Sequence, residues 1–251
     1  MTLLENYKLL NYNVELYDEI SSTMNVCRDK LNSNSHLSYC IVSNSQTNGR
    51  GTKNRTWISA KGGLYFSFTI KKNNLDFLKN GGELDLTIIV SIVLKNFFLS
   101  LNCGEEIRIK WFNDIYFQDK KLAGILCEDY DKENIICGIG INVNNNLDES
   151  LNGISLRSIL KRKLNLRDLL NLFLQYFEKY LKDKKLMEAE KIWGEFGDNN
   201  YILGKKVVYD KIEYEVINIK KNYFLELRNN NGNIKIISWE DTIVKDFILL
   251  N

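Results

Sequence analysis

Hydrophobic residues in the first part of the chain recur in short runs that alternate with polar residues or are wholly apolar. Such runs predict strands over 14–20, 39–43 and 63–70, the last of them rich in aromatic side chains. The serine–threonine pair at 22–23 offers a cap for a short helix over roughly 24–32. This part of the chain therefore predicts a sheet with helices packed on it.

The middle of the chain continues this mixture without any regular βαβ alternation, which favours an α+β fold over a doubly wound sheet. Asn165 caps the longest predicted helix, whose leucine and phenylalanine residues recur on one face and predict a place in the core. The predicted elements are a helix near 84–102, strands over 107–111, 112–118, 122–128 and 135–143, and the long helix over about 166–186.

After two asparagines at 199–200 the pattern changes to short alternating strands separated by turns, which is typical of a small barrel-like domain. We therefore expect two domains, a larger one over 1–198 with helices on a mixed sheet and a small β domain over 199–251. The strands of the small domain are predicted over 206–209, 214–219, 224–228 and 234–239.

Composition narrows the chemistry that this chain can perform. The 251 residues include 34 lysines and arginines against 32 aspartates and glutamates, and a net charge of +2 does not indicate a large nucleic-acid footprint. The five cysteines form no CxxC pair, which predicts reduced structural thiols in a cytosolic protein. The single histidine, His36, is interpreted as an incidental loop residue, so catalysis is expected to depend on lysine, arginine, backbone amides and a magnesium ion.

No segment of the chain predicts export or membrane insertion. Residues 1–5 lack a basic region followed by an apolar core, so a secretory signal is not expected. The most apolar run, 86–94, is too short to cross a bilayer and predicts a buried helix. We expect a cytoplasmic protein with no membrane partner.

Residues 46–57 carry a first concentration of ligand-binding chemistry. Two glycines flank Arg50, further basic residues follow at Lys53 and Arg55, and Trp57 closes the segment. Glycine lets backbone N–H groups approach a ligand and arginine supplies charge and donors, so the pattern is typical of a loop around an anion. Taken alone, the segment would equally fit a solvated basic turn.

A second cluster covers residues 110–126. Lys110, Asn113 and Asp114 precede the turn of the predicted hairpin, and Lys121 begins its returning strand. Small and apolar residues follow Lys121, which places its ammonium group at the mouth of an apolar pocket. A surface hairpin with a basic turn explains this cluster alone equally well.

Together, the two clusters resemble the motifs of the biotin protein ligases, GRGxxxRxW and KWPNDxxxxxxKLAGIL. Three further segments match in the family's order from about residue 15 to 145, and the C-terminal stretch fits the family's small barrel. The matching residues are Gly49-Arg50-Gly51 with Arg55-Thr56-Trp57, Lys110-Trp111-Phe112-Asn113-Asp114 with Lys121-Leu122-Ala123-Gly124-Ile125-Leu126, Ser22-Thr23 (STN/STM), 63–67 (GGLYxS) and 138–144 (GIGINVN).

The resemblance implies a catalytic domain of the class II synthetase and biotin ligase type, followed by a small SH3-like β-barrel. It implies that biotin carboxylate attacks the α-phosphate of ATP, giving biotinoyl-AMP and pyrophosphate. A lysine amine on the biotin carboxyl carrier protein domain of a carboxylase then takes the biotinoyl group. Two anions meet in the first step, so cations placed where charge accumulates lower the barrier.

The site residues that the resemblance implies fall into three groups. Lys121, Arg50 and Arg55 are implied to be catalytic, with Lys121 bridging the biotin carboxylate and the α-phosphate. The implied biotin contacts are Ser22, Thr23, Gln46, Gly49, Arg50, Gly51, Lys121, Gly124, Leu126, Gly138 and Gly140. The implied nucleotide contacts are Arg55, Trp57, Lys110, Asn113 and Asn142, and Asp114 is the candidate ligand of a Mg²⁺ ion that accompanies ATP.

Two departures from the family pattern bear on the adenylate. Thr52 stands where relatives often have a basic residue, so retention of the adenylate is expected to depend more on Lys53, Arg55 or Lys121. Residues 145–156 contain no aromatic residue, whereas some relatives place a tryptophan over adenine in this segment.

Other interpretations remain open. A lipoate or octanoate ligase has the same general fold, but its RRxSGGG loop does not occur in this chain. A non-catalytic biotin-binding module would tolerate loss of Lys121, which is present with its whole segment. A nucleic-acid binder is disfavoured by the near-neutral charge, and about 13 residues before the first predicted strand are too few for a winged-helix domain, so DNA binding is not expected. The resemblance leaves a homodimer open.

Overall fold

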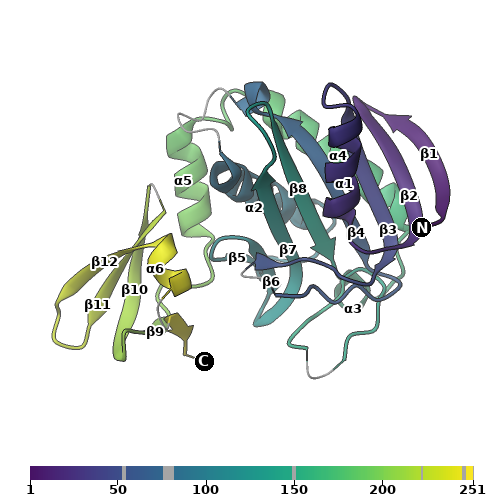
Figure 1. Cartoon of the computed structure of the whole chain (residues 1–251). Coiled ribbons are helices and arrows are strands. Elements are labelled where there is room, and N and C mark those ends of the chain that lie inside the picture. Colours follow the sequence, from purple (N-terminus) through teal and green to yellow (C-terminus); the bar gives the residue numbers. More distant parts are fainter. Residues whose placement is uncertain (53–54, 76–81, 149–150, 222, 245–246, 251) are drawn as a thin grey trace.

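Two β-sheets organise the chain in the computed structural model, which describes residues 1–52, 55–75, 82–148, 151–221, 223–244 and 247–250. The larger sheet has eight strands in the order β1-β2-β3-β4-β8-β7-β6-β5 (Figure 1). The smaller sheet has five strands in the order β12-β11-β10-β9-β13 and lies to one side of the larger one. The α+β class predicted from the sequence is confirmed.

The larger sheet is mixed, because β2 and β3 pair in parallel whereas the other described pairs of its strands are antiparallel. Seven of its strands match the sequence-predicted ones. The exception is the edge strand β1, whose side chains are largely exposed and therefore leave no hydrophobic pattern. The strands are Leu3–Leu9 (β1), Tyr12–Ile20 (β2), Ser38–Gln46 (β3), Leu64–Lys71 (β4), Ile107–Lys110 (β5), Asp114–Phe117 (β6), Lys120–Asp129 (β7) and Asn134–Ile141 (β8).

Helix α1 (Thr23–Ser33) covers one face of the larger sheet, where it packs on β3, β4 and β8. Met24, Cys27 and Leu31 of this helix are buried in one apolar cluster with Ile41 and Ile136 of the sheet. Burial of each large aliphatic side chain contributes about 1.5–3 kcal/mol. This packing fixes the position of α1 on the face of the sheet.

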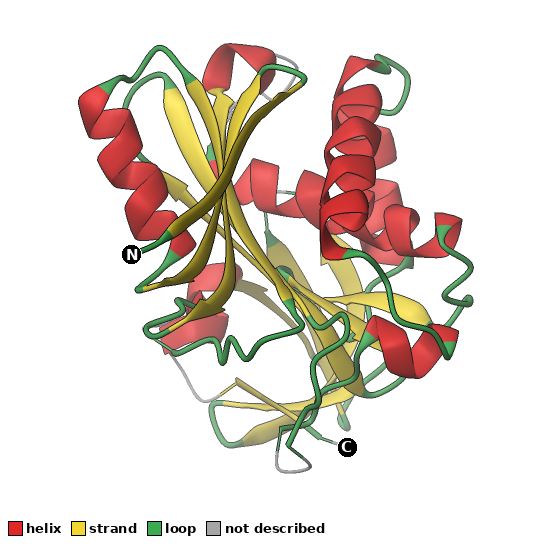
Figure 2. Ribbon diagram, turned by 90° about the vertical axis from the view of Figure 1, so that its right-hand side faces the viewer, coloured by secondary structure: helices red, strands yellow, loops and turns green. Residues whose placement is uncertain are grey.

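Helices α2 (Glu83–Ser100) and α4 (Leu166–Lys182) lie on the opposite face, so the sheet is covered on both sides (Figure 2). Phe66 of β4 meets Phe173 of α4 edge to face with ring centroids 5.6 Å apart. The side chain of Asn165 accepts hydrogen bonds from two backbone N–H groups of the first turn of α4, which confirms the predicted cap. The helix ends at Lys182, four residues before the predicted end.

Helix α2 is strongly apolar, and the side chains of residues 88–90 and 92–94 are buried between the sheet and α4. The sequence predicted this buried helix. Across the described part of the chain, no helix combines the length and the apolar character that crossing a membrane requires.

The smaller sheet is antiparallel throughout its described pairs. Its four predicted strands are confirmed, but β13 was not predicted, and Trp239, predicted to end a strand, instead begins helix α6. The pairings describe an open sheet, so closure into a barrel stays a prediction. The remaining elements are η2 (Lys72–Leu75), α3 (Leu156–Leu160), α5 (Ala189–Asp198), β9 (Lys206–Tyr209), β10 (Ile212–Lys220), β11 (Phe224–Asn229), β12 (Ile234–Ser238), α6 (Trp239–Val244) and β13 (Phe247–Leu249).

The segment that follows α5 and helix α6 contact the larger sheet at its edge strand β5 and at the turn after it. The Ile109 N–H donates to the Asn199 carbonyl at 3.0 Å, and the Tyr201 N–H donates to the Ile109 carbonyl at 2.6 Å. The rings of Phe112 and Trp239 pack edge to face at 5.6 Å. These contacts place α6 beside the segment that precedes β6.

Candidate active site

A cavity of about 200 Å³ lies where β7, β8, the start of α1 and the glycine–arginine loop meet. We use that name for residues 46–52 and 55–57; Lys53 lies outside the described residues. Most of the sequence-predicted site residues line this cavity: Ser22, Thr23, Gln46, Arg50, Gly51, Arg55, Trp57, Asn113, Asp114, Lys121, Gly124, Leu126, Gly138 and Gly140.

Polar side chains form one end of the cavity. Gln46 Oε1 accepts hydrogen bonds from the Thr23 N–H at 2.7 Å and from Thr23 Oγ1 at 3.2 Å. Gln46 Nε2 donates to Ser59 Oγ at 2.8 Å. The buried Ser22 hydroxyl has no hydrogen-bond partner among the described residues. A buried hydroxyl in this state is free to bind a polar ligand group.

Glycines form the floor of the cavity, and the side chains of Trp57 and Met24 lie directly on them. Gly124 and Gly140 are cross-strand partners on β7 and β8. A Cβ at Gly124 would lie 2.7 Å from Trp57 Cζ3, and one at Gly140 would lie 2.5 Å from Trp57 Nε1. A Cβ at Gly138 would lie 2.9 Å from Met24 Cγ. The glycines therefore make room for the indole and the thioether, as well as lining the cavity.

Gly49 lies outside this cavity, on the adjoining depression that includes Glu128. A Cβ at Gly49 would approach the Trp57 carbonyl oxygen to 2.3 Å, and the Trp57 N–H donates to the Gly49 carbonyl at 2.9 Å. Glycine is required here because the two ends of the loop touch backbone to backbone.

Lys121 lines the cavity, and its ammonium group pairs with another residue of the cavity wall. Its Nζ lies 2.7 Å from Asp114 Oδ1 and 5.0 Å from the centroid of the Trp57 ring. The Lys121 carbonyl accepts from the Ile154 N–H at 3.0 Å and from Asn142 Nδ2 at 3.3 Å. In this structure the buried Asn142 side chain thus contacts the backbone that carries Lys121.

The two arginines of the loop have different partners. Arg50 forms a bidentate ion pair with Glu128, with distances of 2.5 Å from Nη2 to Oε1 and 3.1 Å from Nη1 to Oε2. The exposed Arg55 folds back on its own loop, where its guanidinium donates to the Thr52 carbonyl at 3.2 Å and to Thr52 Oγ1 at 2.9 Å.

A second, larger cavity of about 680 Å³ continues from the first and shares Arg55, Asn113, Asp114 and Lys121 with it. Lys110 lines this second cavity, and its Nζ lies 3.1 Å from the Tyr116 hydroxyl and 4.3 Å from the centroid of that ring. Burial lowers the pKa of the Lys110 ammonium group below its usual value.

The far wall of the second cavity comes from the C-terminal part of the chain, from which sequence reasoning had chosen no site residue. The residues of this wall are Trp239, Thr242, Phe247 and Leu249. Sequence reasoning also missed several residues of the first cavity, which lie within the matched motif segments or next to them and could have been found from that position. They are Met24, Thr52, Thr56, Ile125 and Ile139.

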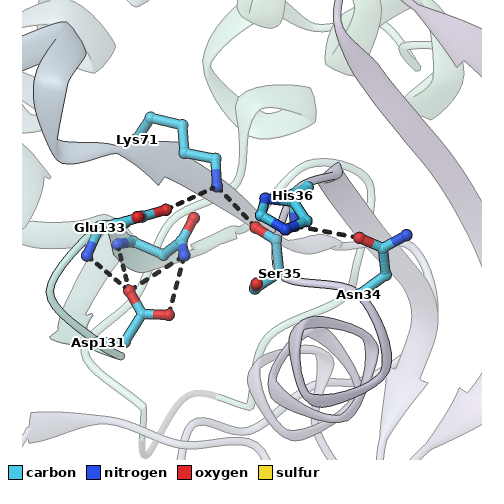
Figure 3. Close-up of polar contacts among 7 residues, drawn as sticks. Asn34, Ser35, His36, Lys71, Asp131 and Glu133 are labelled. Atoms are coloured by element: carbon cyan, nitrogen blue, oxygen red, sulfur yellow. Dashed lines mark hydrogen bonds and ion pairs between the residues drawn. The ribbon is translucent and has the colours of Figure 1, made fainter.

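The single histidine lies apart from both cavities, on the exposed loop between α1 and β3. Figure 3 shows His36 beside Asn34, whose Oδ1 accepts from the His36 N–H at 3.1 Å. Lys71 donates to the neighbouring Ser35 carbonyl at 2.6 Å. The described residues also contain no group of three His, Cys, Asp or Glu side chains that could hold a metal ion.

Comparison with known proteins places this geometry in a family. The model of the Biotin/lipoate A/B protein ligase family matches residues 16–144, just over half of the chain. The chain belongs to this family. The matched range includes the second half of β2, the whole of α1, the glycine–arginine loop and every residue of β7 and β8.

Individual relatives agree with the family match. The bifunctional ligase/repressor BirA of Bacillus subtilis is 32% identical over 177 residues, which cover 66% of this chain and 53% of that protein. The chloroplastic biotin–protein ligase 1 of Arabidopsis thaliana is 29% identical over 216 residues, which cover 79% of this chain and 55% of that protein. The chain thus spans about half the length of these two relatives.

A solved structure of this family covers nearly the whole chain. The biotin protein ligase from Aquifex aeolicus, in complex with biotin and ATP, superposes with a TM-score of 0.74 at 27% identity. The superposition covers 95% of this chain and 98% of the Aquifex chain. The likeness therefore extends beyond the family match to the smaller sheet.

Proposed function

We propose that this family member is an ATP-dependent ligase that activates biotin as biotinoyl-5'-AMP and transfers it to a lysine of a biotin carboxyl carrier protein. One observation carries the proposal: the Lys121 ammonium group and the free Ser22 hydroxyl line the same cavity, whose floor is formed by glycines of β7 and β8. A ligand with a carboxylate at one end and a polar ring at the other matches that cavity.

The polar end of the cavity suits the ureido ring of biotin. That ring offers N–H donors and a carbonyl acceptor, and the hydroxyls of Ser22 and Thr23 with the amide of Gln46 supply both kinds of partner. Trp57 and Met24 cover Gly124, Gly138 and Gly140, and the aliphatic chain of biotin is proposed to lie along these two side chains between the polar end and Lys121.

The charged end suits the first chemical step. When the biotin carboxylate attacks the α-phosphate, negative charge accumulates on the phosphoryl oxygens, and a cation fixed beside them lowers the barrier. Lys121 is the cation at the junction of the two cavities, and Arg55 lines both. The second cavity, with Asn113 and Lys110, is the proposed place of the nucleotide.

Magnesium is proposed to arrive with ATP rather than to occupy a protein cage. Mg²⁺ is usually held by one or two carboxylates together with substrate phosphates. Asp114 fits this arrangement as a single carboxylate at the wall of both cavities, where it now pairs with Lys121.

The smaller sheet is proposed to be the family's SH3-like barrel. Its last strand, β13, returns to pair with its first strand, β9, with Ile248 opposite Val208. This return places β13 at one edge of the sheet, and closure of the barrel requires this edge to meet β12 at the other.

The test is incubation of the purified chain with ATP, Mg²⁺ and either biotin or lipoate, followed by mass spectrometry for the acyl-adenylate. We expect biotinoyl-AMP, and a mass increase of one biotinoyl group on an added biotin carboxyl carrier domain. Failure to form the adenylate with biotin would overturn the proposal, and lipoyl-AMP alone would move the chain to the lipoate branch of the family.

A further inference from the structure

Glu128, near the end of β7, accepts from two arginines that come from different parts of the chain. Its Oε1 lies 2.5 Å from Arg50 Nη2, and its Oε2 lies 3.1 Å from Arg50 Nη1 and 2.9 Å from Arg28 Nη2. Arg28 belongs to α1 and Arg50 to the glycine–arginine loop. One carboxylate thus connects three of the elements that surround the first cavity.

The ion pair with Glu128 affects the first cavity through Arg50. The backbone of Arg50 pairs with that of Thr56, and the Gly51 N–H donates to the Arg55 carbonyl at 2.8 Å. The two sides of the loop are therefore paired through their backbones. Fixing the position of Arg50 also fixes the position of Thr56 opposite it. Arg50, Gly51 and Thr56 all line the first cavity, whereas Glu128 lines the second cavity and not the first.

The glycine–arginine loop contacts β7 at two separate places. Trp57 rests on Gly124, and Arg50 pairs with Glu128 four residues further along the same strand. Because Lys121 and Leu126 also belong to β7, both contacts set the loop against the strand that carries the charged end of the cavity.

The environment favours a strong ion pair. The side chains of Glu128 and Arg50 are 22% and 35% exposed, and their bidentate geometry is the strongest form of arginine–carboxylate contact. Arg28 adds a second positive charge on the same carboxylate and connects it to the helix that begins with Thr23.

We propose that Glu128 is a positioning residue that holds Arg50, and through it the glycine–arginine loop, against β7 so that the cavity retains its ligand. This assignment rests on the proposed function for the identity of the ligand, biotin. Glu128 lines the second cavity and not the first, so its effect on biotin retention is assigned to its contact with Arg50.

The first measurement is the dissociation rate of biotin from the full chain without ATP. Glu128→Gln keeps the size of the side chain and removes its charge, and we expect dissociation to become about tenfold faster. The matched control is Glu133→Gln at the β7–β8 turn, where Glu133 is 70% exposed and lies 4.0 Å from Lys71 (Figure 3). The control is expected to match the unchanged chain.

The second measurement follows Arg50 itself. Trypsin must bind the arginine side chain to cut after it, so the ion pair with Glu128 protects the Arg50–Gly51 bond. Mass spectrometry of brief digests should show faster cutting after Arg50 in Glu128→Gln, relative to cutting after Arg55, which contacts Thr52 instead. Arg28→Gln leaves the Arg50 pair in place and should change either measurement by less than about threefold.

The outcomes separate this inference from the proposed function. If the unchanged chain does not bind biotin, the proposed function fails while the trypsin measurement still tests the contact. Biotin dissociation from Glu128→Gln within twofold of the unchanged chain, or an equal effect of Glu133→Gln, would overturn the inference. Glu128→Asp keeps the charge but shortens the side chain by one carbon, so it should give intermediate values in both measurements. It replaces Glu128→Gln as the test variant if Glu128→Gln does not fold. Unchanged values for Glu128→Asp in both measurements would then count against the inference.

Discussion

At the scale of single residues, the environment of Lys121 suits the role proposed for it, in which one side chain serves two anions. Its ammonium group lies between the Asp114 carboxylate at 2.7 Å and the face of the Trp57 ring at 5.0 Å. The backbone hydrogen bonds from Ile154 and Asn142 fix where the side chain starts. A carboxylate or phosphate that enters the cavity would replace Asp114 as the partner of this cation.

Replacement of Lys121 tests this role directly. We expect Lys121→Ala to slow pyrophosphate release by at least about 100-fold, since it removes the fixed charge where negative charge accumulates. Lys120→Ala is the matched control because Lys120 is exposed and lines neither cavity. Normal pyrophosphate release from a folded Lys121→Ala would contradict the assignment.

The buried thiol of Cys103 predicts an alkaline limit to stability. Burial raises the pKa of this thiol from 9.0 to about 11. Its folded state therefore favours the protonated form, so the stability that it contributes is complete below pH 9.0 and is lost as the pH rises through about 11. We expect Cys103→Ala to reduce the fall in the free energy of unfolding across this window by about 2 kcal/mol, measured by urea unfolding. An equal fall in the free energy of unfolding in the unchanged chain and in Cys103→Ala would contradict this role of the thiol.

At the scale of elements, β7 and β8 act together as a platform. Gly124 and Gly140 face each other across the strand pair and leave a flat surface on which the Trp57 indole lies. A side chain on either glycine would occupy space that the ring now fills. The close approach of the loop to the sheet therefore depends on two residues that have no side chain.

Gly140→Ala tests the platform. The new Cβ would lie 2.5 Å from the Trp57 ring, so the indole must move, and we expect biotin affinity measured by calorimetry to fall about tenfold. Gly194→Ala is the control, because its Cβ would meet nothing within 4 Å and it lies within α5. That change should stabilise the chain by about 0.5–1 kcal/mol. Unaltered biotin affinity in Gly140→Ala would show that the indole position does not matter.

At the scale of the whole molecule, the segment that follows α5 joins the two sheets. The carbonyl and N–H groups of residues 199–201 pair with β5, and Asn200 Oδ1 accepts from the Trp111 N–H at 3.3 Å. The domain boundary expected at 198–199 thus lies directly before residues that extend the edge of the larger sheet. The second cavity depends on this junction, because both sheets contribute to its walls.

Asn200→Ala tests the junction. Asn200 is buried, and its loss leaves the Trp111 N–H without that acceptor, so we expect the free energy of unfolding to fall by about 1–3 kcal/mol. Asn230→Ala in the exposed turn between β11 and β12 should change it by less than about 0.5 kcal/mol. Equal urea midpoints for the two variants would argue against a structural role of Asn200.

Much of the fold followed from hydrophobic periodicity, since a buried strand or helix face must be apolar at a regular spacing. The strands of the larger sheet with buried faces were predicted in this way, and α4 was predicted with its Asn165 cap. The elements that were missed, such as β1, α5 and β13, are short or largely exposed, so burial imposes little pattern on them.

The candidate site was predicted where contiguous motifs carry it, because residues close in sequence on a loop or hairpin stay close in space. By itself, the sequence determined the strands with buried faces, the motif residues and their order, and hence the family resemblance that the comparisons bear out. Only the tertiary structure decided which distant groups meet. Arg50 and Glu128 are 78 residues apart, and Trp239 reaches the second cavity from helix α6, which follows a strand of the smaller sheet. Such pairs leave no periodic trace, because each residue alone is an ordinary exposed or half-buried side chain until packing brings its partner within reach.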